Sequence, residues 1–356
     1  MSGPDPVVAE SAGLTYVTDA LPGVTRHRGD DGWVYRRPDG GVITDPAERA
    51  WIDAIRIPPA WTDVWISPTP NGHILATGRD SRGRKQYRYH PRWREVRDRT
   101  KYHRLGDFAG ALPGLRRHLE RDLDLPGLPR EKVLAAVIRL MDLTLVRIGN
   151  EEYARQNRTY GLTTLRHDHV RFQDRTTVMF EFRAKSGKEQ RVLLSDPRLA
   201  DVVHACHELP GQELFQYVDD DGKVVDVGSA EVNAYLRAIT RAIFTAKDFR
   251  TWGGTVVAAE TLVMLGPPRD ERDAKRKINA AIDAAAERLN NTRAVCRRSY
   301  VCPVVPESYV DGSLAGTFAR VGKRPRLSPA ESAVAVLMSR PDRTAGSVLH
   351  SSSGGR

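Results

Sequence analysis

The sequence has little cysteine, no long apolar stretch and no secretory signal. Only three cysteines occur among 356 residues, and they form no CxxC pair, so we expect no disulfide framework. No stretch approaches the roughly 18 apolar residues that span a bilayer, which argues against a membrane protein. The N-terminal residues lack the basic start and the apolar run of a secretory signal, which predicts a cytoplasmic protein.

The motifs of common phosphate chemistries are also absent. Gly316 and Gly322-Lys323 resemble a P-loop only superficially, because five residues separate the glycines and Arg324 replaces the Ser or Thr. No compact group of Asp and Glu has metal-ligand spacing, which argues against a two-metal nuclease or polymerase. The nearest approach to a metal cluster, His204-Ala205-Cys206-His207, fits an amphipathic helix better. We therefore expect neither a cofactor nor a metal.

Positive charge is abundant, and it is unevenly distributed. The formal net charge is +10, and residues 74–104 hold eleven Lys or Arg and three Asp or Glu, so 11 − 3 leaves +8 there. A charge run is usually a solvated surface. This run also contains Tyr87, Tyr89, Trp93 and Tyr102, and cations interleaved with flat side chains suit a groove that binds a polyphosphate.

The first part of the chain, residues 1–103, is punctuated like a small antiparallel sheet. Turn sequences separate short apolar runs, and the expected strands lie at Val34–Tyr35, Val64–Ser67, Ile74–Thr77 and Lys85–His90. After them, Lys101 to Asp107 is expected to form a hinge or linker. Since single cores usually stop growing at roughly 250 to 300 residues, the chain has room for a second domain.

The second domain is expected at residues 104–327 and to be mainly α-helical, which makes the fold class α+β. Apolar residues recur with helical spacing from Leu134 to Ile148, between Pro129 and Gly149, and this places Arg147 in the last turn of a helix. Further helices are expected after Ser229 and between Glu271 and Leu289.

One small hairpin interrupts the helical pattern. Phe180 and Phe182 alternate with polar residues, and the Ser186-Gly187 turn places Lys185 at the hairpin tip.

Residues 328–356 are rich in Ser, Arg and Gly, and we expect them to be a disordered tail.

Four local motifs together contain a set of cationic and nucleophilic residues. They are LVRIGNEEYARQNRTYGLTTL from Leu145, FRAKSGKEQ from Phe182, KDFRTWGGT from Lys247 and NNTRAVCRRSYV from Asn290. In this order they closely resemble the catalytic domain of the poxvirus-type and bacterial type IB DNA topoisomerases. The segment GRDSRGRKQYRYH, from Gly78, resembles the DNA-contacting sheet domain of the same family. The likeness spans roughly residues 51–303.

The resemblance implies an enzyme that relaxes supercoiled duplex DNA without metal or ATP. It would cut one strand, hold the end as a 3′-phosphotyrosine and religate it, and Arg147, Lys185, Arg250 and Tyr300 become the catalytic set. Guanidiniums bind the non-bridging oxygens of a phosphodiester with rigid, permanently charged donors. Tyr300 is the nucleophile, and the Lys185 ammonium protonates the departing 5′-hydroxyl.

Asn291 is a departure from the viral pattern, because the poxvirus members carry His nine residues before the nucleophile. We expect its amide to donate a hydrogen bond to a non-bridging oxygen of the scissile phosphate. The alternative is that Asn291 merely ends the helix after Leu289. The resemblance also implies a set of DNA-binding residues: Arg79, Arg84, Gln86, Tyr87, Tyr89 and Lys247.

Two other functions remain open at this stage. A tyrosine recombinase shares the Arg, Lys and Tyr chemistry but typically has a His-x-x-Arg box, where this chain has Lys247-Asp248-Phe249-Arg250. A non-catalytic DNA-binding module would wrap DNA without forming a covalent adduct. The favoured interpretation is a monomer that clamps around duplex DNA, especially supercoiled DNA, in the cytoplasm at the nucleoid.

Overall fold

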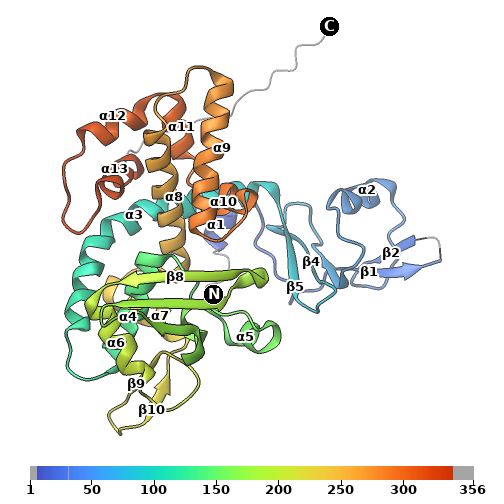
Figure 1. Ribbon diagram of the computed structural model, residues 1–356. Helices are drawn as coiled ribbons and strands as arrows, with labels where there is room; N and C mark the ends of the chain where they lie inside the picture. The colour runs from blue at the N-terminus through green and yellow to red at the C-terminus, as the bar shows by residue number, and fades with distance from the viewer. Residues whose placement is uncertain (1–5, 31, 340–356) are drawn as a thin grey trace. The chain divides into compact units, whose positions relative to one another are not determined.

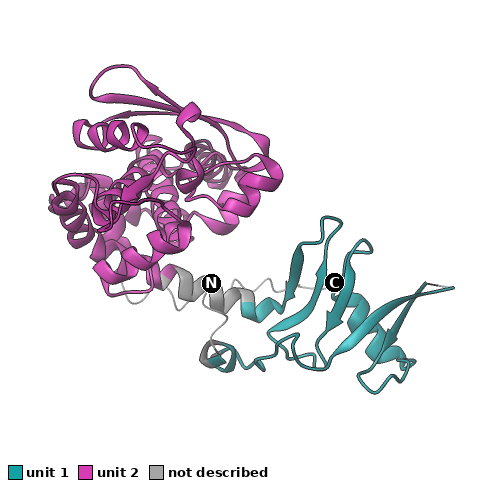
Figure 2. Ribbon diagram, turned by 90° about the horizontal axis from the view of Figure 1, so that it is seen from below, with its two compact units in different colours: residues 1–101 teal, residues 102–356 magenta. Residues whose placement is uncertain are grey.

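The structure is a computed structural model that describes residues 6–30 and 32–339, except for the side chains of residues 7, 8, 11, 94–101 and 103. The chain divides into two compact units, residues 1–101 and residues 102–356 (Figure 2). The first contains an antiparallel sheet and the second is mainly helical (Figure 1), so the predicted α+β class is confirmed. The structure does not describe the predicted tail beyond residue 339. It also leaves out the side chains of the basic residues at 94, 97, 99 and 101.

The first unit is built on a five-stranded antiparallel sheet with the strand order β2-β1-β3-β4-β5. Its apolar core gathers residues such as Val24, Tyr35 and Ile66 on the sheet and Ile52 on a helix. The predicted strands are confirmed, and β1 is an addition to them. The elements are α1 (Pro6–Ser11), β1 (Val24–Gly29), β2 (Gly32–Arg36), α2 (Pro46–Ala54), β3 (Thr62–Ile66), β4 (Ile74–Arg79) and β5 (Lys85–Tyr89).

The aromatic residues of the basic segment have different environments. Tyr87 is 42% exposed, and its ring stacks on that of Tyr89 at 5.8 Å. Trp93 is only 2% exposed, because it packs against Ala9 and Leu14, so the prediction that Trp93 lines a polyphosphate groove is wrong. The Tyr102 hydroxyl donates a hydrogen bond to the backbone oxygen of Val301, which gives it a structural contact inside the second unit.

Helix α4 (Arg130–Thr144) lies at the centre of the second unit. Its side chains from Val133 to Ile138 are all fully buried, and it packs against α6, α7 and α8. The predicted helices at 229 and 271 are confirmed as α7 (Ser229–Thr240) and α9 (Glu271–Arg288). The other helices are α3 (Pro91–Leu123), α5 (Glu151–Asn157), α6 (Pro197–His207), α8 (Ala246–Met264), α10 (Arg293–Ser299), α11 (Val304–Val310), α12 (Ser313–Arg320) and α13 (Pro329–Met338).

The predicted hairpin is confirmed as β7 (Thr177–Arg183) and β8 (Glu189–Ser195), which β6 (Val170–Phe172) extends to three strands. A short 3₁₀ turn, Lys185–Gly187, closes it, and Ser186 and Gly187 both have positive φ values there. A second, two-stranded sheet pairs β9 (Gln216–Val218) with β10 (Val224–Asp226). In the amphipathic helix α6, the ring of His204 stacks on Phe172 at 3.8 Å.

Two predictions about chain boundaries are wrong. The segment Lys101–Asp107, expected as a hinge or linker, is helical within α3, where Leu105 is buried in the core. Residues 329–338, expected in the disordered tail, form helix α13, whose Ala333 and Val334 are fully buried. In both segments apolar contacts stabilise a helix that composition alone did not indicate. Within the described ranges, no helix is long and apolar enough to cross a membrane.

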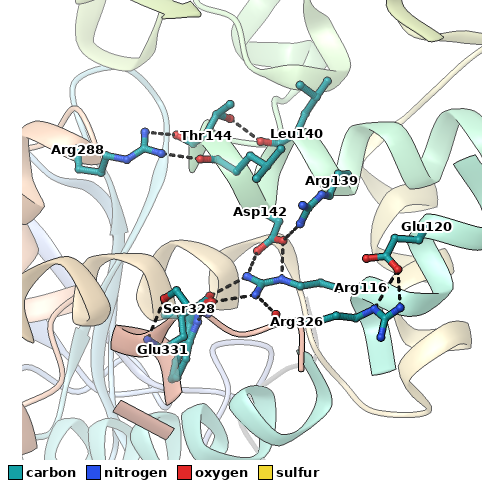
Figure 3. A network of polar contacts seen from close by, with 12 residues as sticks. Arg116, Glu120, Arg139, Leu140, Asp142, Thr144, Arg288, Arg326, Ser328 and Glu331 are labelled. Carbon is teal, nitrogen blue, oxygen red and sulfur yellow. Dashed lines mark hydrogen bonds and ion pairs between the residues drawn. The ribbon is translucent and has the colours of Figure 1, made fainter. Parts of the chain in front are cut away.

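A buried ionic network ties α13 to the centre of the second unit (Figure 3). The Arg116 side chain, on α3, is 13% exposed and binds the carboxylates of Asp142 at 2.8 Å and Glu331 at 2.7 Å. The indole N–H of Trp252, on α8, also donates to Glu331 at 3.1 Å. Burial raises the pKa of Glu331, but the hydrogen bonds from Arg116 outweigh burial and lower it. The last described helix is therefore an integral part of the second unit.

We predict that Glu331→Gln lowers the free energy of unfolding by about 3 kcal/mol, because Arg116 and Arg139 must then share the single carboxylate of Asp142, which leaves a net positive charge in the buried network. The matched control is Glu120→Gln, since Glu120 pairs with Arg326 at 2.8 Å with both side chains more than a third exposed. That exposed pair should contribute less than about 1 kcal/mol. Urea unfolding of the two variants measures the difference, and equal losses would contradict a buried network.

Candidate active site

The loop that carries Arg147 begins where α4 ends. Leu145 adopts a left-handed conformation with φ of 58°, which terminates the helix, so the prediction that Arg147 lies in its last turn is wrong. The Arg147 backbone oxygen accepts a hydrogen bond from Leu162 at 2.9 Å. The next carbonyl, that of Ile148, accepts from both the backbone and the hydroxyl of Thr163. These bonds hold the loop in one conformation.

Arg250 lies on α8 and is buried, with 4% exposure. Its guanidinium donates to the backbone oxygens of Leu145, at the end of α4, and of Leu289 at 2.8 Å, at the end of α9. The last carbonyls of a helix have no partner within the helix, so a buried arginine is a suitable donor for them. Burial, together with the charge of Arg147, lowers the pKa of Arg250 to about 10.

A second arginine, which the motifs did not indicate, binds the same helix end. Arg288, from the last turn of α9, donates to the backbone oxygens of Thr144 at 3.0 Å and Leu143 at 2.5 Å (Figure 3). Together with Arg250, it satisfies successive carbonyls at the end of α4. These contacts fix the origin of the loop that carries Arg147.

Tyr300 follows directly on α10, and its backbone is held on both sides. The fully buried Thr255 hydroxyl contacts the Tyr300 carbonyl oxygen at 3.1 Å and accepts a hydrogen bond from the Cys302 N–H at 3.1 Å. Gly254 permits this approach, since a Cβ there would lie 3.1 Å from the Tyr300 oxygen and 2.9 Å from the Leu289 side chain. Sequence patterns did not indicate Thr255, because its role depends on a partner 45 residues away.

The Tyr300 ring lies in a cationic environment. The guanidinium carbon of Arg250 is 5.2 Å from the ring centroid. Burial raises the pKa of the Tyr300 phenol, but the charges of Arg250, Arg147 and Lys247 outweigh burial and lower its pKa. The lowered pKa favours the phenolate, which is the nucleophilic form of a tyrosine.

Asn291 contacts the arginine of the neighbouring loop. Its side-chain oxygen accepts a hydrogen bond from Arg147 at 2.9 Å. A guanidinium can only donate, so the Asn291 amide must turn its oxygen towards Arg147 and its nitrogen away from Arg147. That nitrogen is buried and has no hydrogen-bond partner among the described residues. A buried donor without a partner is costly, which indicates that a ligand acceptor completes the site.

The end of α9 is formed by Asn290, which decides between the two interpretations of Asn291. Asn290 adopts the left-handed conformation with φ of 47°, and its N–H binds the Glu287 oxygen at 3.0 Å. The N–H of Asn291 then binds the Ala286 oxygen at 2.8 Å, which completes a Schellman motif. The side chain of Asn291 takes no part in this helix end.

The two candidate lysines differ in how they interact with this cluster. Lys247 is exposed in the first turn of α8, and its charge acts on Tyr300. Lys185 is exposed at the tip of the hairpin and makes no hydrogen bond to Arg147, Arg250 or Tyr300. Contacts and charges thus link the two arginines, the tyrosine, Asn291 and Lys247, whereas Lys185 makes no hydrogen bond to them.

The DNA-binding candidates of the first unit lie on β4, β5 and the turn between them. Arg79 donates to the Gly83 oxygen at 2.9 Å, and Arg84 pairs with Asp80 at 2.7 Å. Gln86 and Tyr87 are neighbours on β5, so their side chains point to opposite faces of the sheet. This hairpin therefore presents cations, an amide and an aromatic ring at one edge of the sheet.

The arrangement in the second unit suits nucleophilic attack on a phosphodiester. It offers a phenol of lowered pKa, permanently charged donors for the phosphate oxygens and an unpartnered amide N–H. Among the described residues, no group of three or more His, Cys, Asp and Glu could hold a metal ion. A cavity of about 650 Å³ lined by residues such as Asp122 and Tyr235 includes none of the candidate residues.

Comparison with known proteins identifies the family. The model of the eukaryotic DNA topoisomerase I catalytic core matches residues 90–302, and that of the bacterial DNA topoisomerase IB N-terminal domain matches residues 32–80. DNA topoisomerase 1B of Acanthamoeba polyphaga mimivirus is 33% identical over 298 residues, which cover 81% of this chain and 88% of the viral protein. DNA topoisomerase 1 of Schizosaccharomyces pombe is 23% identical over 241 residues, which cover 67% of this chain and 27% of the yeast protein.

The core model spans more than half of the chain, and the viral protein is similar over most of both sequences. The resemblance seen in the motifs is thereby confirmed. The chain belongs to the type IB DNA topoisomerase family.

Proposed function

We propose that this type IB DNA topoisomerase cleaves one strand of duplex DNA with Tyr300 and then reseals it. The phenolate oxygen attacks the scissile phosphorus, a 3′-phosphotyrosine bond forms, and the bond to the 5′-oxygen breaks. The 5′-hydroxyl later attacks the phosphotyrosine and restores both the DNA and the phenol. The energy of the broken phosphodiester is conserved in the covalent bond, so the cycle needs no nucleotide.

The observation that carries this proposal is the cationic cluster around Tyr300. Arg250 lies against the ring, and its charge with that of Arg147 lowers the pKa of the phenol despite burial. The same charges would bind a phosphodiester and stabilise the charge that gathers on its non-bridging oxygens. An environment that favours an anionic phenolate therefore also favours the transition state of its attack.

Each group near Tyr300 has a proposed task. Arg147 and Arg250 bind the non-bridging oxygens with the donors that their protein contacts leave free. Asn291 donates its unpartnered amide N–H to one of those oxygens. Lys247 adds positive charge from the first turn of α8 and contacts the DNA backbone.

Lys185 is the proposed general acid, although it does not contact the cluster. The departing 5′-oxygen is a poor leaving group unless it receives a proton, and an ammonium on a hairpin tip can supply one. The tip residues Ser186 and Gly187 have positive φ values that shape a tight turn behind Lys185. We propose that bound DNA brings this tip to the scissile bond.

The substrate that we propose is duplex DNA, with supercoiled DNA preferred. The exposed Tyr87 and the cations Arg79 and Arg84 suit contacts to the sugar-phosphate backbone and the bases. Gln86 and Tyr89 in the first unit and Lys247 in the second complete the proposed DNA-binding set, and the proposed form is a monomer that clamps around the duplex at the nucleoid. Phosphate contacts of this kind make binding strongly dependent on salt.

Two other functions are disfavoured. The tyrosine recombinase and the non-catalytic DNA-binding module both conflict with membership of the topoisomerase family. Formation of a covalent protein–DNA adduct separates the catalytic from the non-catalytic function. Relaxation of a closed plasmid without exchange of strands between partners separates a topoisomerase from a recombinase.

We predict that the wild-type chain relaxes negatively and positively supercoiled plasmid in excess EDTA without nucleotide, and that Tyr300→Phe abolishes both relaxation and the adduct. The substitution removes only the nucleophilic oxygen, so noncovalent DNA binding should persist.

Lys185→Ala in the same assay should slow adduct formation without abolishing it, since water can still protonate the leaving oxygen. Detergent trapping and a gel-shift assay provide the measurements.

The outcomes of this experiment are distinguishable. An adduct formed by the Phe variant would identify another nucleophile. A strict requirement of the wild-type protein for magnesium or ATP would contradict the proposed mechanism. A tyrosine linked to the 5′ side of the break would contradict the proposed direction of cleavage.

We predict that Asn291→Ala slows single-turnover cleavage about 100- to 1000-fold with little change in Tm, because it removes one donor to the transition state. Asn290→Ala is the matched control. It places an unfavourable residue in the left-handed position that ends α9, so it should lower stability by roughly 1 kcal/mol while cleavage stays near the normal rate. Asn291→His should recover part of the lost rate. An Asn291→Ala variant that cleaves normally would remove Asn291 from the site.

A further inference from the structure

Asp80, at the turn between β4 and β5, uses its two carboxylate oxygens for different tasks. Oδ1 accepts hydrogen bonds from the backbone N–H groups of Arg82 and Arg84, both at 3.0 Å, and so shapes the turn. Oδ2 accepts from the Arg84 guanidinium at 2.9 and 2.7 Å and from the Gln86 side-chain amide at 3.0 Å. One oxygen thus holds the backbone, and the other holds two side chains of the proposed DNA-binding surface.

This contact determines which end of the Gln86 amide is available. Hydrogen bonding to Arg84 lowers the pKa of Asp80 to about 2, so the carboxylate is ionised and can only accept. Gln86 must therefore turn its NH₂ group towards Asp80. The amide oxygen accepts no hydrogen bond from the described residues, and it is not among their buried unpartnered atoms. Its acceptor is thus left facing the solvent.

Nothing else near Gln86 fixes its amide. Its partner across the strand pair is Gly78, which has no side chain. The neighbouring cation on the same face, Arg88, donates to the Arg56 oxygen at 2.8 Å instead. The orientation of the Gln86 amide therefore depends on Asp80.

We propose that Asp80 is a specificity-determining residue, which sets Gln86 to present a hydrogen-bond acceptor to a base edge of duplex DNA. The inference rests on the proposed function, in which Gln86 belongs to the DNA-binding surface. In the major groove, adenine and cytosine offer an amino group to such an acceptor, whereas guanine and thymine offer a carbonyl oxygen that repels it. The remaining N–H of Gln86 can bind N7 of adenine, so adenine fits best.

Asp80→Asn should reverse which end of the Gln86 amide is free, with a minimal change in the shape of the side chain. The Asn side chain keeps the oxygen that binds the backbone N–H groups of the turn, but it places an NH₂ group where Oδ2 was. An NH₂ group at that point cannot accept from Arg84, so the half-exposed Arg84 side chain turns to the solvent. The NH₂ group then pairs with the Gln86 oxygen, so the Gln86 amide turns over and presents its own NH₂ group outwards. The favoured base should therefore change from one with an amino group to one with a carbonyl oxygen.

The experiment uses the full chain and a library of duplex oligonucleotides with randomised base pairs. Covalently trapped DNA from single-turnover cleavage is sequenced for the wild type and the variants. At one position the wild type should favour an amino-bearing base by at least about 5-fold, the lower end of what a base contact contributes. Asp80→Asn should shift that preference towards guanine or thymine at the same position, and Gln86→Ala should flatten it.

Arg84→Ala is the control, because Arg84 shares the same carboxylate oxygen. It should weaken trapping at all sequences and keep the base preference, as expected for a phosphate contact. If Gln86→Ala flattens the preference and Asp80→Asn leaves it unchanged, the role of Asp80 is overturned. If Gln86→Ala changes nothing while adducts still form, Gln86 reads no base and the inference fails, although the proposed function stands. If the wild type forms no adduct at all, the proposed function itself fails.

Discussion

A buried guanidinium joins the ends of two helices at the centre of the second unit. Arg250 donates to the last carbonyls of α4 and α9, and these helix ends lead directly to Arg147 and to Asn291. Arg250 also lies against the ring of Tyr300. The positions of the proposed catalytic groups thus depend on one side chain whose charge also lowers the pKa of Tyr300. Removing it would disturb the geometry and the electrostatics together.

The cluster is incomplete without an anion. Two guanidiniums lie close enough for the charge of Arg147 to lower the pKa of Arg250, and the Asn291 amide N–H has no partner among the described residues. In the proposed function, a phosphodiester supplies this charge and this acceptor. In the first unit, Asp80 likewise determines which end of the Gln86 amide is free. In both places a charged neighbour fixes an amide, and the proposed function places that amide at the substrate.

Local patterns predicted most elements, whereas contacts between distant residues determined the rest. Turn sequences and alternation identified the strands and the hairpin that carries Lys185. The helical spacing around Leu134 continued through Leu145 and Ile148, so it could not show that Leu145 turns left-handed and ends α4 before Arg147. The motif tyrosine and arginines were found by resemblance. Thr255 and Arg288 were missed, because their partners lie 45 and 144 residues away in the sequence. Asp80 lies inside a recognised motif, but the motif does not show that its carboxylate binds the side chain of Gln86.

The central claim is that the arginines hold Tyr300 ready to ionise. Its most direct test is the titration of tyrosines labelled with ¹³C at the phenolic carbon, followed by NMR, with the Tyr300 signal assigned by its absence in Tyr300→Phe. The account predicts a midpoint below the ordinary tyrosine value of about 10 for Tyr300. Tyr235 should remain protonated over the same range, because burial and its bond to Asp122 raise its pKa. A Tyr300 midpoint at or above about 10 would contradict the account.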